Sequence, residues 1–313
     1  MSLGLTVHPN LKKAGRTKWN LKRNWVLYAC LVPAAVMLVI FSYIPMYGLQ
    51  IAFKDFNPAL GFAKSPWVGL DWYKALFTLP NFTTVITNTV VIAVIKIILG
   101  QFVPIVFALL LNEVKQIHFK KTVQTMVYLP HFLSWVIVGG LFLDLLSGDG
   151  LVNQAVGLLG FKPIPFLYSN DWFKFTIIST DIWKGFGWGA ILYLAALTNI
   201  SPELYEAGVI DGATRFQRMI HITIPGISPT IVLLAALSLG SILNAGFDQI
   251  LILYNPAVYE SGDVLDTFIF RQGLTDMQFS LATAVGLLRS VIGFGLVLLS
   301  NYLAYKLANY RIF

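Results

Sequence analysis

The amino-acid sequence predicts an all-α integral membrane protein with six transmembrane helices. Hydrophobic residues make up 57% of the 313 residues and charged residues only 12%, so the chain cannot cover itself with a water-compatible surface. The apolar residues also form long runs, each close to or above the roughly 20 residues that a helix needs to cross a bilayer. The six runs lie at about 25–53, 83–111, 122–146, 173–198, 222–247 and 281–307.

The first run is expected to be a retained helix. It is longer than the apolar region of a cleavable signal peptide, and no small-residue cleavage site follows it. The lone Cys30 lies inside this run, which excludes an intrachain disulfide and a cysteine metal site. No internal repeat or low-complexity segment divides the chain. We therefore expect a basic N-terminal segment, 1–24, followed by one transmembrane domain over 25–313.

Lysine and arginine residues mark the loops that we expect in the cytoplasm, because positive charge is held on that side of the membrane. Six of them lie in 1–24 and three in 112–121: Lys12, Lys13, Arg16, Lys18, Lys22, Arg23, Lys115, Lys120 and Lys121. Six helices then place the 199–221 loop and the tail with Lys306 and Arg311 inside as well. The loops 54–82, 147–172 and 248–280 are expected outside. They carry acids: Asp55, Asp71, Asp149, Asp171, Glu260, Asp263, Asp266 and Asp276.

The net charge of +7 thus follows from topology and from contact with anionic lipid. It does not indicate nucleic-acid binding.

The polar loop at 199–221 is expected to form two short helices. Ser201 can cap the first, Pro202 suits its first position, and the helix should run from 202 to about 210. Asp211 and Gly212 then allow a sharp bend with positive φ, after which 213–220 can form a second helix. Apolar and basic side chains on this loop face the cytosol, so the loop needs a partner.

This loop reads Glu206-Ala207-Gly208-Val209-Ile210-Asp211-Gly212-Ala213, and Ile222-Thr223-Ile224-Pro225 follows. The spacing resembles the EAA loop of ATP-binding-cassette (ABC) importer permeases, in which Glu-Ala-Ala precedes a Gly and then Ile-x-Leu-Pro. Gly208 replaces the second Ala of that pattern, and Ile224 replaces its Leu. The resemblance implies that the loop couples the membrane helices to an ATPase through Glu206, Ala207, Asp211, Gly212, Ala213, Arg215, Phe216, Arg218 and Pro225.

The resemblance extends from residue 25 to the end of the chain. Among these permeases, the chain is similar to the carbohydrate-uptake branch. The stretches 204–207, 247–250 and 253–259 resemble the subgroup for oligo- and polysaccharides. The resemblance implies a type I importer-permease fold in a bacterial cytoplasmic membrane. It also implies a second homologous permease, two cytosolic ATP-binding-cassette ATPase subunits and an extracytoplasmic solute-binding protein.

The chain itself is not expected to be an enzyme. It has no Gly-x-x-x-x-Gly-Lys-[Ser/Thr] loop and no His-Glu-x-x-His pair, and its histidines at positions 8, 118, 131 and 221 are scattered. We expect no cofactor, metal or catalytic residue here, and we expect ATP and Mg²⁺ on the partner ATPase.

Ionisable residues at membrane depth suggest where a solute passes, because they are costly there and default to paired or functional roles. They are Lys96, Asp181, Lys184, Asp248 and Arg289. Trp183 and Trp188 can present flat faces to sugar rings, and Lys184 can donate to hydroxyls or to a carboxylate. Alternatively, Asp181 and Lys184 form an i,i+3 ion pair and the indoles belong to an interfacial belt.

Other polar residues are candidates for the same path. Ser238, Ser241 and Asn244 recur at three-residue spacing and share a helix face, although their polar groups can also be satisfied by helix backbone. Ser134 and Trp135 complete the set.

The class of solute stays open at this point. The membrane-depth cations Lys96, Lys184 and Arg289 favour an acidic oligosaccharide, such as a uronate or alginate-like fragment, over a neutral one. A permease for a non-sugar solute, a secondary transporter and a membrane-embedded enzyme are the alternatives. Inverted repeats and a convergent catalytic cluster, which the last two would require, are not visible in the sequence.

Overall fold

A computed structural model describes residues 25–308 of the chain. The basic segment 1–24 and Arg311, used above for the topology, lie outside the described residues. Internal contacts divide the chain into two compact units, Met1–Gln50 and Ile51–Phe313. Whether 1–24 and 25–313 behave as separate domains stays a prediction.

The described part of the first unit is helical throughout. It begins with α1 (Trp25–Leu38), continues through a π-helical turn (Val39–Tyr43) and enters a 3₁₀ helix (Ile44–Phe53). Its apolar side chains are largely exposed. The stretch Tyr28–Phe53 is long and apolar enough to cross a membrane.

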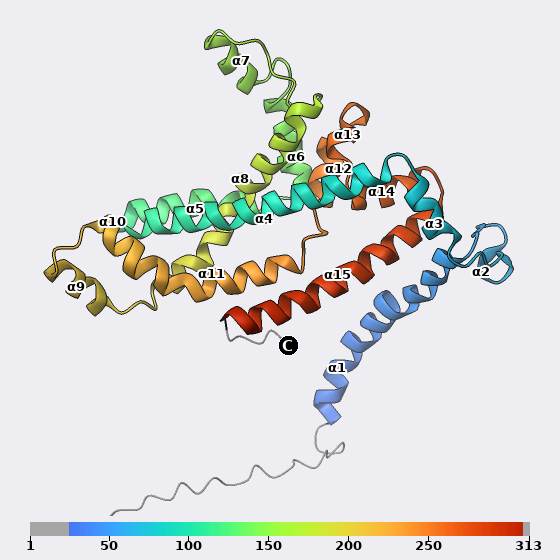
Figure 1. The fold of residues 1–313 in the computed structure, drawn as a ribbon, viewed down its shortest axis with the longest axis horizontal. Helices are drawn as coiled ribbons and strands as arrows, with labels where there is room; N and C mark the ends of the chain where they lie inside the picture. Colours follow the sequence, from blue (N-terminus) through green and yellow to red (C-terminus); the bar gives the residue numbers. More distant parts are fainter. Residues whose placement is uncertain (1–24, 309–313) are drawn as a thin grey trace, which may run out of the picture. The chain divides into compact units, whose positions relative to one another are not determined.

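The second unit contains the remaining helices (Figure 1). They are α2 (Gly61–Lys64), α3 (Asp71–Thr78), α4 (Phe82–Asn112), α5 (Ile117–Phe132), α6 (Trp135–Leu145), α7 (Leu151–Leu158), α8 (Asn170–Leu197), α9 (Pro202–Ile210), α10 (Arg215–Arg218), α11 (Ile224–Leu239), α12 (Phe247–Leu253), α13 (Tyr259–Gly262), α14 (Leu265–Phe270) and α15 (Phe279–Ala308). Shorter turns follow α10, α12 and α14: Met219–Thr223, Pro256–Val258 and Arg271–Thr275.

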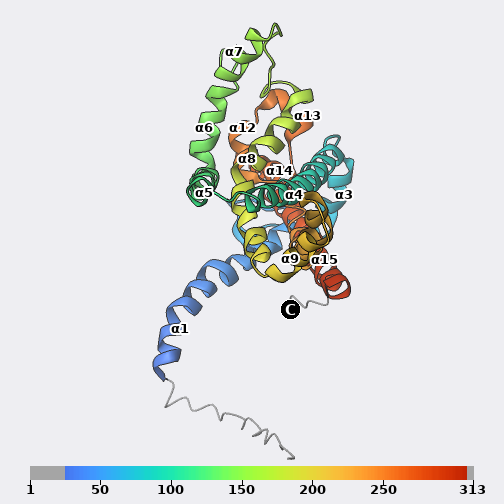
Figure 2. The same ribbon diagram turned by 90° about the vertical axis from the view of Figure 1, so that its left-hand side faces the viewer.

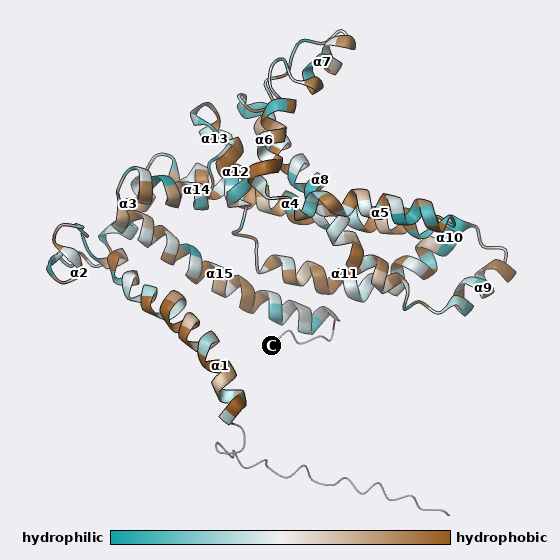
Figure 3. Ribbon diagram, turned by 180° about the vertical axis from the view of Figure 1, so that it is seen from behind, coloured by the Kyte–Doolittle hydropathy of each residue, from teal (hydrophilic) through white to brown (hydrophobic). Residues whose placement is uncertain are grey.

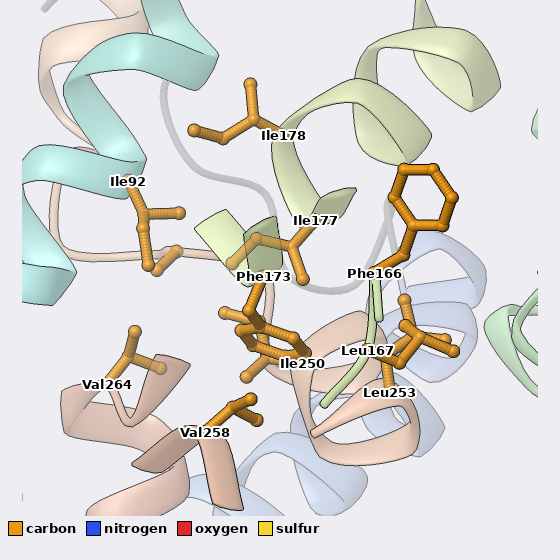
Figure 4. Close-up of a cluster of buried hydrophobic side chains, with 11 residues drawn as sticks. Ile92, Phe166, Leu167, Phe173, Ile177, Ile178, Ile250, Leu253, Val258 and Val264 are labelled. Atoms are coloured by element: carbon orange, nitrogen blue, oxygen red, sulfur yellow. The ribbon is translucent and has the colours of Figure 1, made fainter. Parts of the chain in front are cut away.

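Helix α4 connects three clusters of buried side chains. Phe82 and Val85 at its start pack with residues of α3, α14 and α15. Ile92 packs with residues of α8 and α12, as Figure 4 shows. Ala108 and Leu109 near its end pack with residues of α8 and α11. The core of this unit therefore follows α4 along its length.

Within residues 25–308, four helices are long and apolar enough to cross a membrane. The count is five if one bent pair of helices forms a single span. The four are Tyr28–Phe53, Phe82–Asn112, Arg215–Leu239 and Phe279–Tyr302. Helix α8, expected as the fourth span, is a continuous helix of 28 residues, but Asp181, Lys184 and several glycines interrupt its apolar sequence. The expected count of six is therefore not confirmed by apolar length alone.

Two expected spans have different boundaries from those predicted. The run at 122–146 is a bent pair, because α5 and α6 meet at an angle of 102° and Leu133 and Ser134 between them are extended. The α5–α6–α7 succession is visible in Figure 2.

The fifth span does not reach residue 247: its helix ends at Leu239, and α12 begins only at Phe247. Polar and small residues, including Gly246 with φ +96°, interrupt the helix there.

Different helices lie near the two ends of α4. Figure 1 shows α3 at its start and α9 and α10 near its end. Hydrophilic residues gather at that second end, where α5 begins and α10 lies (Figure 3). The loops 54–82 and 199–221 therefore lie at opposite ends of α4, and which end is cytoplasmic stays a prediction.

Candidate functional site

The 199–221 loop folds as two helices joined by a turn. Helix α9 covers Pro202–Ile210 as expected, and Gly212 has φ +73°. The second helix, α10, begins at Arg215 and not at 213, because Thr214 caps it. Ser201 stands at the N-cap of α9, but its side chain makes no capping hydrogen bond.

A capping box that we did not predict defines the start of α10. The Thr214 hydroxyl accepts from the Gln217 backbone N–H (3.3 Å), and the Gln217 side chain accepts from the Thr214 N–H (2.8 Å). The S/T-x-x-E/Q pattern at these positions was the available signal.

The two helices pack on each other around Gly208. A methyl group added there would lie 3.2–3.3 Å from the Arg218 stem and from Ile222 Cδ1. The hydroxyls of Tyr205 and Thr223 lie 3.0 Å apart and link α9 to the turn after α10. An alanine at position 208 would therefore make tight contacts, and Arg218 and Ile222 would have to shift slightly to accept it.

Three apolar side chains of the 199–221 loop are exposed to solvent. Val209, Ile210 and Phe216 are 56%, 85% and 65% exposed. A cavity of about 330 Å³ lies beside them. It is lined by Asp211, Gly212, Ala213, Gln217, Arg218, His221 and Ile222. Such a surface is typical of a docking site.

A second cavity, of about 340 Å³, lies beside the middle of α4, between α4, α8 and the segment after α11. We call it the membrane-depth cavity, because α4 is long and apolar enough to cross a membrane. The predicted path residues Asp181, Ser238, Ser241 and Asn244 line it. Lys96, Gln101 and Gly246 also line it, together with Ala93, Ile97, Gly100 and Ala245. The three-residue spacing therefore identified one wall of a polar cavity.

The polar groups of that wall are also satisfied internally. The Ser238 hydroxyl donates to Leu234 O (2.8 Å) and the Ser241 hydroxyl to Ser238 O (2.9 Å). The Asn244 side-chain oxygen accepts from the Gly246 N–H (3.4 Å). A hydroxyl oxygen that donates to backbone keeps acceptor capacity, so the wall can still accept hydrogen bonds from a solute.

Asp181 pairs with a residue that the sequence did not connect to it. Its carboxylate lies 3.5 Å from Lys96 Nζ, and the Asp181 side chain is 33% exposed. The i,i+3 ion pair between Asp181 and Lys184 is absent among the described residues. The pairing crosses from α8 to α4, which sequence spacing could not reveal.

Lys184 and Trp188 face α5 and α6. Lys184 Nζ donates to His131 O (3.0 Å) and lies 5.5 Å from the centre of the Trp135 ring. The Trp188 indole stacks on the His131 ring, with centres 4.6 Å apart and planes 1° from parallel. His131, one of the scattered histidines of the sequence, thus contacts both predicted residues.

The other two candidates of this group have structural contacts. The Ser134 hydroxyl caps α6 by accepting from the Ile137 N–H (3.3 Å), and Trp183 packs edge-on against Phe142. The predicted path residues therefore fall into two groups. One lines the membrane-depth cavity, and the other lies where α5 bends into α6. Lys184 and Trp188 are not in the cavity lining.

Residues 102–309 match the family described as "Binding-protein-dependent transport system inner membrane component". The chain belongs to this family. It is therefore an inner-membrane transport component, as the resemblance at the 199–221 loop implied. Within residues 25–308, no group of His, Cys, Asp and Glu side chains is arranged to hold a metal ion.

Relatives of this transport component cover almost its whole length. It is 43% identical to protein LplB of Bacillus subtilis, over 91% of this chain and 90% of LplB. It is also 43% identical to the polygalacturonan/rhamnogalacturonan transport system permease protein YteP of the same organism, over 92% and 90%. Among solved structures, a chain of a bacterial alginate ABC transporter, in complex with an alginate pentasaccharide-bound periplasmic protein, matches with a TM-score of 0.84. It is 40% identical, with 93% of this chain and 98% of that chain covered.

Proposed function

We propose that this chain is the permease subunit of an ATP-driven ABC importer that passes an acidic oligosaccharide into the cytoplasm. The polar cavity at membrane depth carries the proposal, because a water-free bilayer tolerates such groups only along a solute path or in internal pairs. The similar transport proteins are named for polygalacturonan and alginate. Both are polymers of uronates and support an acidic sugar.

The loop of α9 and α10 supplies the connection to ATP in this proposal. Its exposed Val209, Ile210 and Phe216 would enter a pocket on a cytosolic ATPase, and Arg215 and Arg218 would add charge. ATP and Mg²⁺ would bind to that ATPase and not to this chain. Glu206, Ala207, Asp211 and Ala213 would frame the contact, and Pro225 would begin the span that transmits movement.

The remaining partners follow from the family. A second homologous permease would complete the pathway, and an extracytoplasmic binding protein would deliver the sugar. We propose that α8 also crosses the membrane, as the fourth of six spans in chain order, because it is 28 residues long, or about 42 Å at 1.5 Å per residue. Its polar residues would face the path and not lipid.

The proposed path has a hydroxyl-binding part and a charge-binding part. Asp181, Ser238, Ser241 and Asn244 in the cavity suit sugar hydroxyls. Lys184, Trp188 and Trp135 offer a cation beside indoles, a mixture that suits a carboxylate-bearing ring. A neutral oligosaccharide is the second candidate, since Lys96 and Arg289 both pair with carboxylates of the chain itself.

Reconstitution tests the proposal. Proteoliposomes with the assembled transporter and its binding protein should accumulate a short oligouronate only when ATP is supplied to the ATPase side. The same oligosaccharide with its carboxyl groups reduced to alcohols is the matched control, because it differs only in charge. Preferential uptake of the uronate supports the acidic substrate.

Equal uptake of both sugars would favour the neutral candidate. Uptake driven by an ion gradient without ATP would contradict an ABC importer altogether.

A further inference from the structure

The interruption of the fifth span leaves backbone carbonyls that the regular hydrogen bonds of α11 and α12 do not pair. Helix α11 ends at Leu239 and α12 begins at Phe247, and we call residues 240–246 the break segment. The last carbonyls of a helix have no partner inside that helix, and an unsatisfied carbonyl is costly where water is absent. Backbone N–H groups pair with the carbonyls of Leu237, Ser238, Leu239 and Ser241, whereas the carbonyls of Leu243 and Ala245 accept from side chains of other helices.

Lys96 binds the break segment from α4. Its Nζ donates to Ala245 O (2.8 Å) and to Gln249 Oε1 (2.5 Å), and it lies 3.5 Å from the Asp181 carboxylate. An ammonium group has three donors, so these acceptors use its full capacity. The Lys96 side chain is 9% exposed.

Gly246 makes this approach possible. Its φ of +96° disfavours any L side chain, and a methyl group there would lie 2.8 Å from Lys96 Nζ.

Arg289 binds the break segment from α15. Its Nε and Nη2 donate to Leu243 O at 3.3 and 3.2 Å. The same guanidinium pairs with Asp266 of α14 at 3.0 Å (Nη1) and 3.1 Å (Nη2). Two cations from different helices thus hold carbonyls two residues apart, and each is neutralised by its own carboxylate.

We infer that Lys96 and Arg289 are positioning residues. They fix the break segment so that Ser241 and Asn244 form the cavity wall, and they do not recognise the charge of the substrate. This inference rests on the proposed function, since it assigns roles within the proposed path. It reverses the sequence-based expectation that the membrane-depth cations favour an acidic solute: of the three, only Lys184 has no carboxylate partner among the described ion pairs.

Two substitutions of Lys96 separate the effect of losing its hydrogen-bond donor from the effect of losing its charge. Lys96→Gln removes the charge but keeps an N–H donor for Ala245 O, whereas Lys96→Met removes both. Uptake of an oligouronate and of its carboxyl-reduced form is measured in proteoliposomes at saturating binding protein and divided by the wild-type value for each sugar. We expect Lys96→Met to lower the maximal rate about tenfold below that of Lys96→Gln. The factor should be the same for both sugars, and the KM should not change.

Lys174→Met on α8 is the control for loss of a lysine and should transport normally. A loss confined to the oligouronate in both Lys96 variants would show charge recognition and overturn the inference. Equal transport by Lys96→Met and Lys96→Gln would also overturn it.

If Lys96→Met does not assemble, Lys96→Gln decides alone, because a selective loss of uronate uptake refutes positioning and a parallel change for both sugars supports it. Failure of the wild type to import either sugar with ATP would instead refute the proposed function.

Discussion

At the scale of single residues, the difference among the membrane-depth cations is in their partners. Lys96 and Arg289 each face a carboxylate and a backbone carbonyl of the chain. Lys184 donates to the His131 carbonyl and lies over the Trp135 ring, and among the described residues it forms no ion pair with a carboxylate. A cation held by one carbonyl and an aromatic face keeps donors available, so Lys184 is the residue whose charge a uronate would meet.

Lys184→Gln should therefore lower uptake of oligouronates by about tenfold, as expected for the loss of one hydrogen bond to a charged group. Uptake of the carboxyl-reduced sugar should change little. The measurement is initial uptake of each sugar in proteoliposomes, with basal ATPase activity as the check on assembly. Lys184→Arg, which keeps the charge, is the control and should retain the preference for the uronate. Equal losses for the two sugars in Lys184→Gln would indicate that Lys184 only packs against α5 and α6.

At the scale of elements, the loop of α9 and α10 depends on its bend. Gly212 has φ +73° with open space around it, so the requirement at this position is for backbone conformation and not for room. A β-branched residue in the left-handed region costs about 1 to 2 kcal/mol. The angle between the two helices is therefore the property that a substitution here would change.

Gly212→Val should weaken binding of the ATPase or uncouple hydrolysis from uptake, while membrane insertion stays normal. Co-purification of the ATPase and substrate-stimulated hydrolysis measure the two effects. Gly160→Val is a matched control, because Gly160 also has positive φ (+84°) with no neighbour within 4 Å and lies in a loop expected outside. Normal coupling in Gly212→Val, or the same defect in Gly160→Val, would show that the bend does not determine docking.

The elements also show what sequence reasoning could reach. Helix α9 and the positive φ of Gly212 follow from local rules, because Pro, Asp and Gly act within a few residues. The break segment and the bend between α5 and α6 were missed, because the glycine, proline and few polar residues at both places also occur inside membrane helices. Tertiary contacts hold the break segment: Lys96 and Arg289 donate to carbonyls 149 and 46 positions away in the chain. The Asp181–Lys96 pair was out of reach for the same reason.

At the scale of the whole molecule, charge and architecture group the same loops together. The count of basic residues predicts that the 112–121 and 199–221 loops are both cytoplasmic. In the structure, the start of α5 and α10 lie at one end of α4, and α3 lies at the other (Figure 1). Helix α4 has 31 residues, about 46 Å at 1.5 Å per residue, which exceeds the roughly 30 Å of a hydrocarbon core. Its two ends must therefore reach opposite surfaces.

Cysteine labelling tests this orientation. In a Cys30→Ala background, Lys64→Cys in α2 and Phe216→Cys in α10 each present one thiol, and both native side chains are exposed. An impermeant thiol reagent applied to intact cells should label Lys64→Cys only, because the membrane separates it from the 199–221 loop. Inverted vesicles should reverse the pattern, which also serves as the control that Phe216→Cys is reactive. Labelling of Phe216→Cys in cells with an intact inner membrane would place α9 and α10 outside. No cytosolic ATPase could then reach them, and the coupling role proposed for the loop would fail together with the topology.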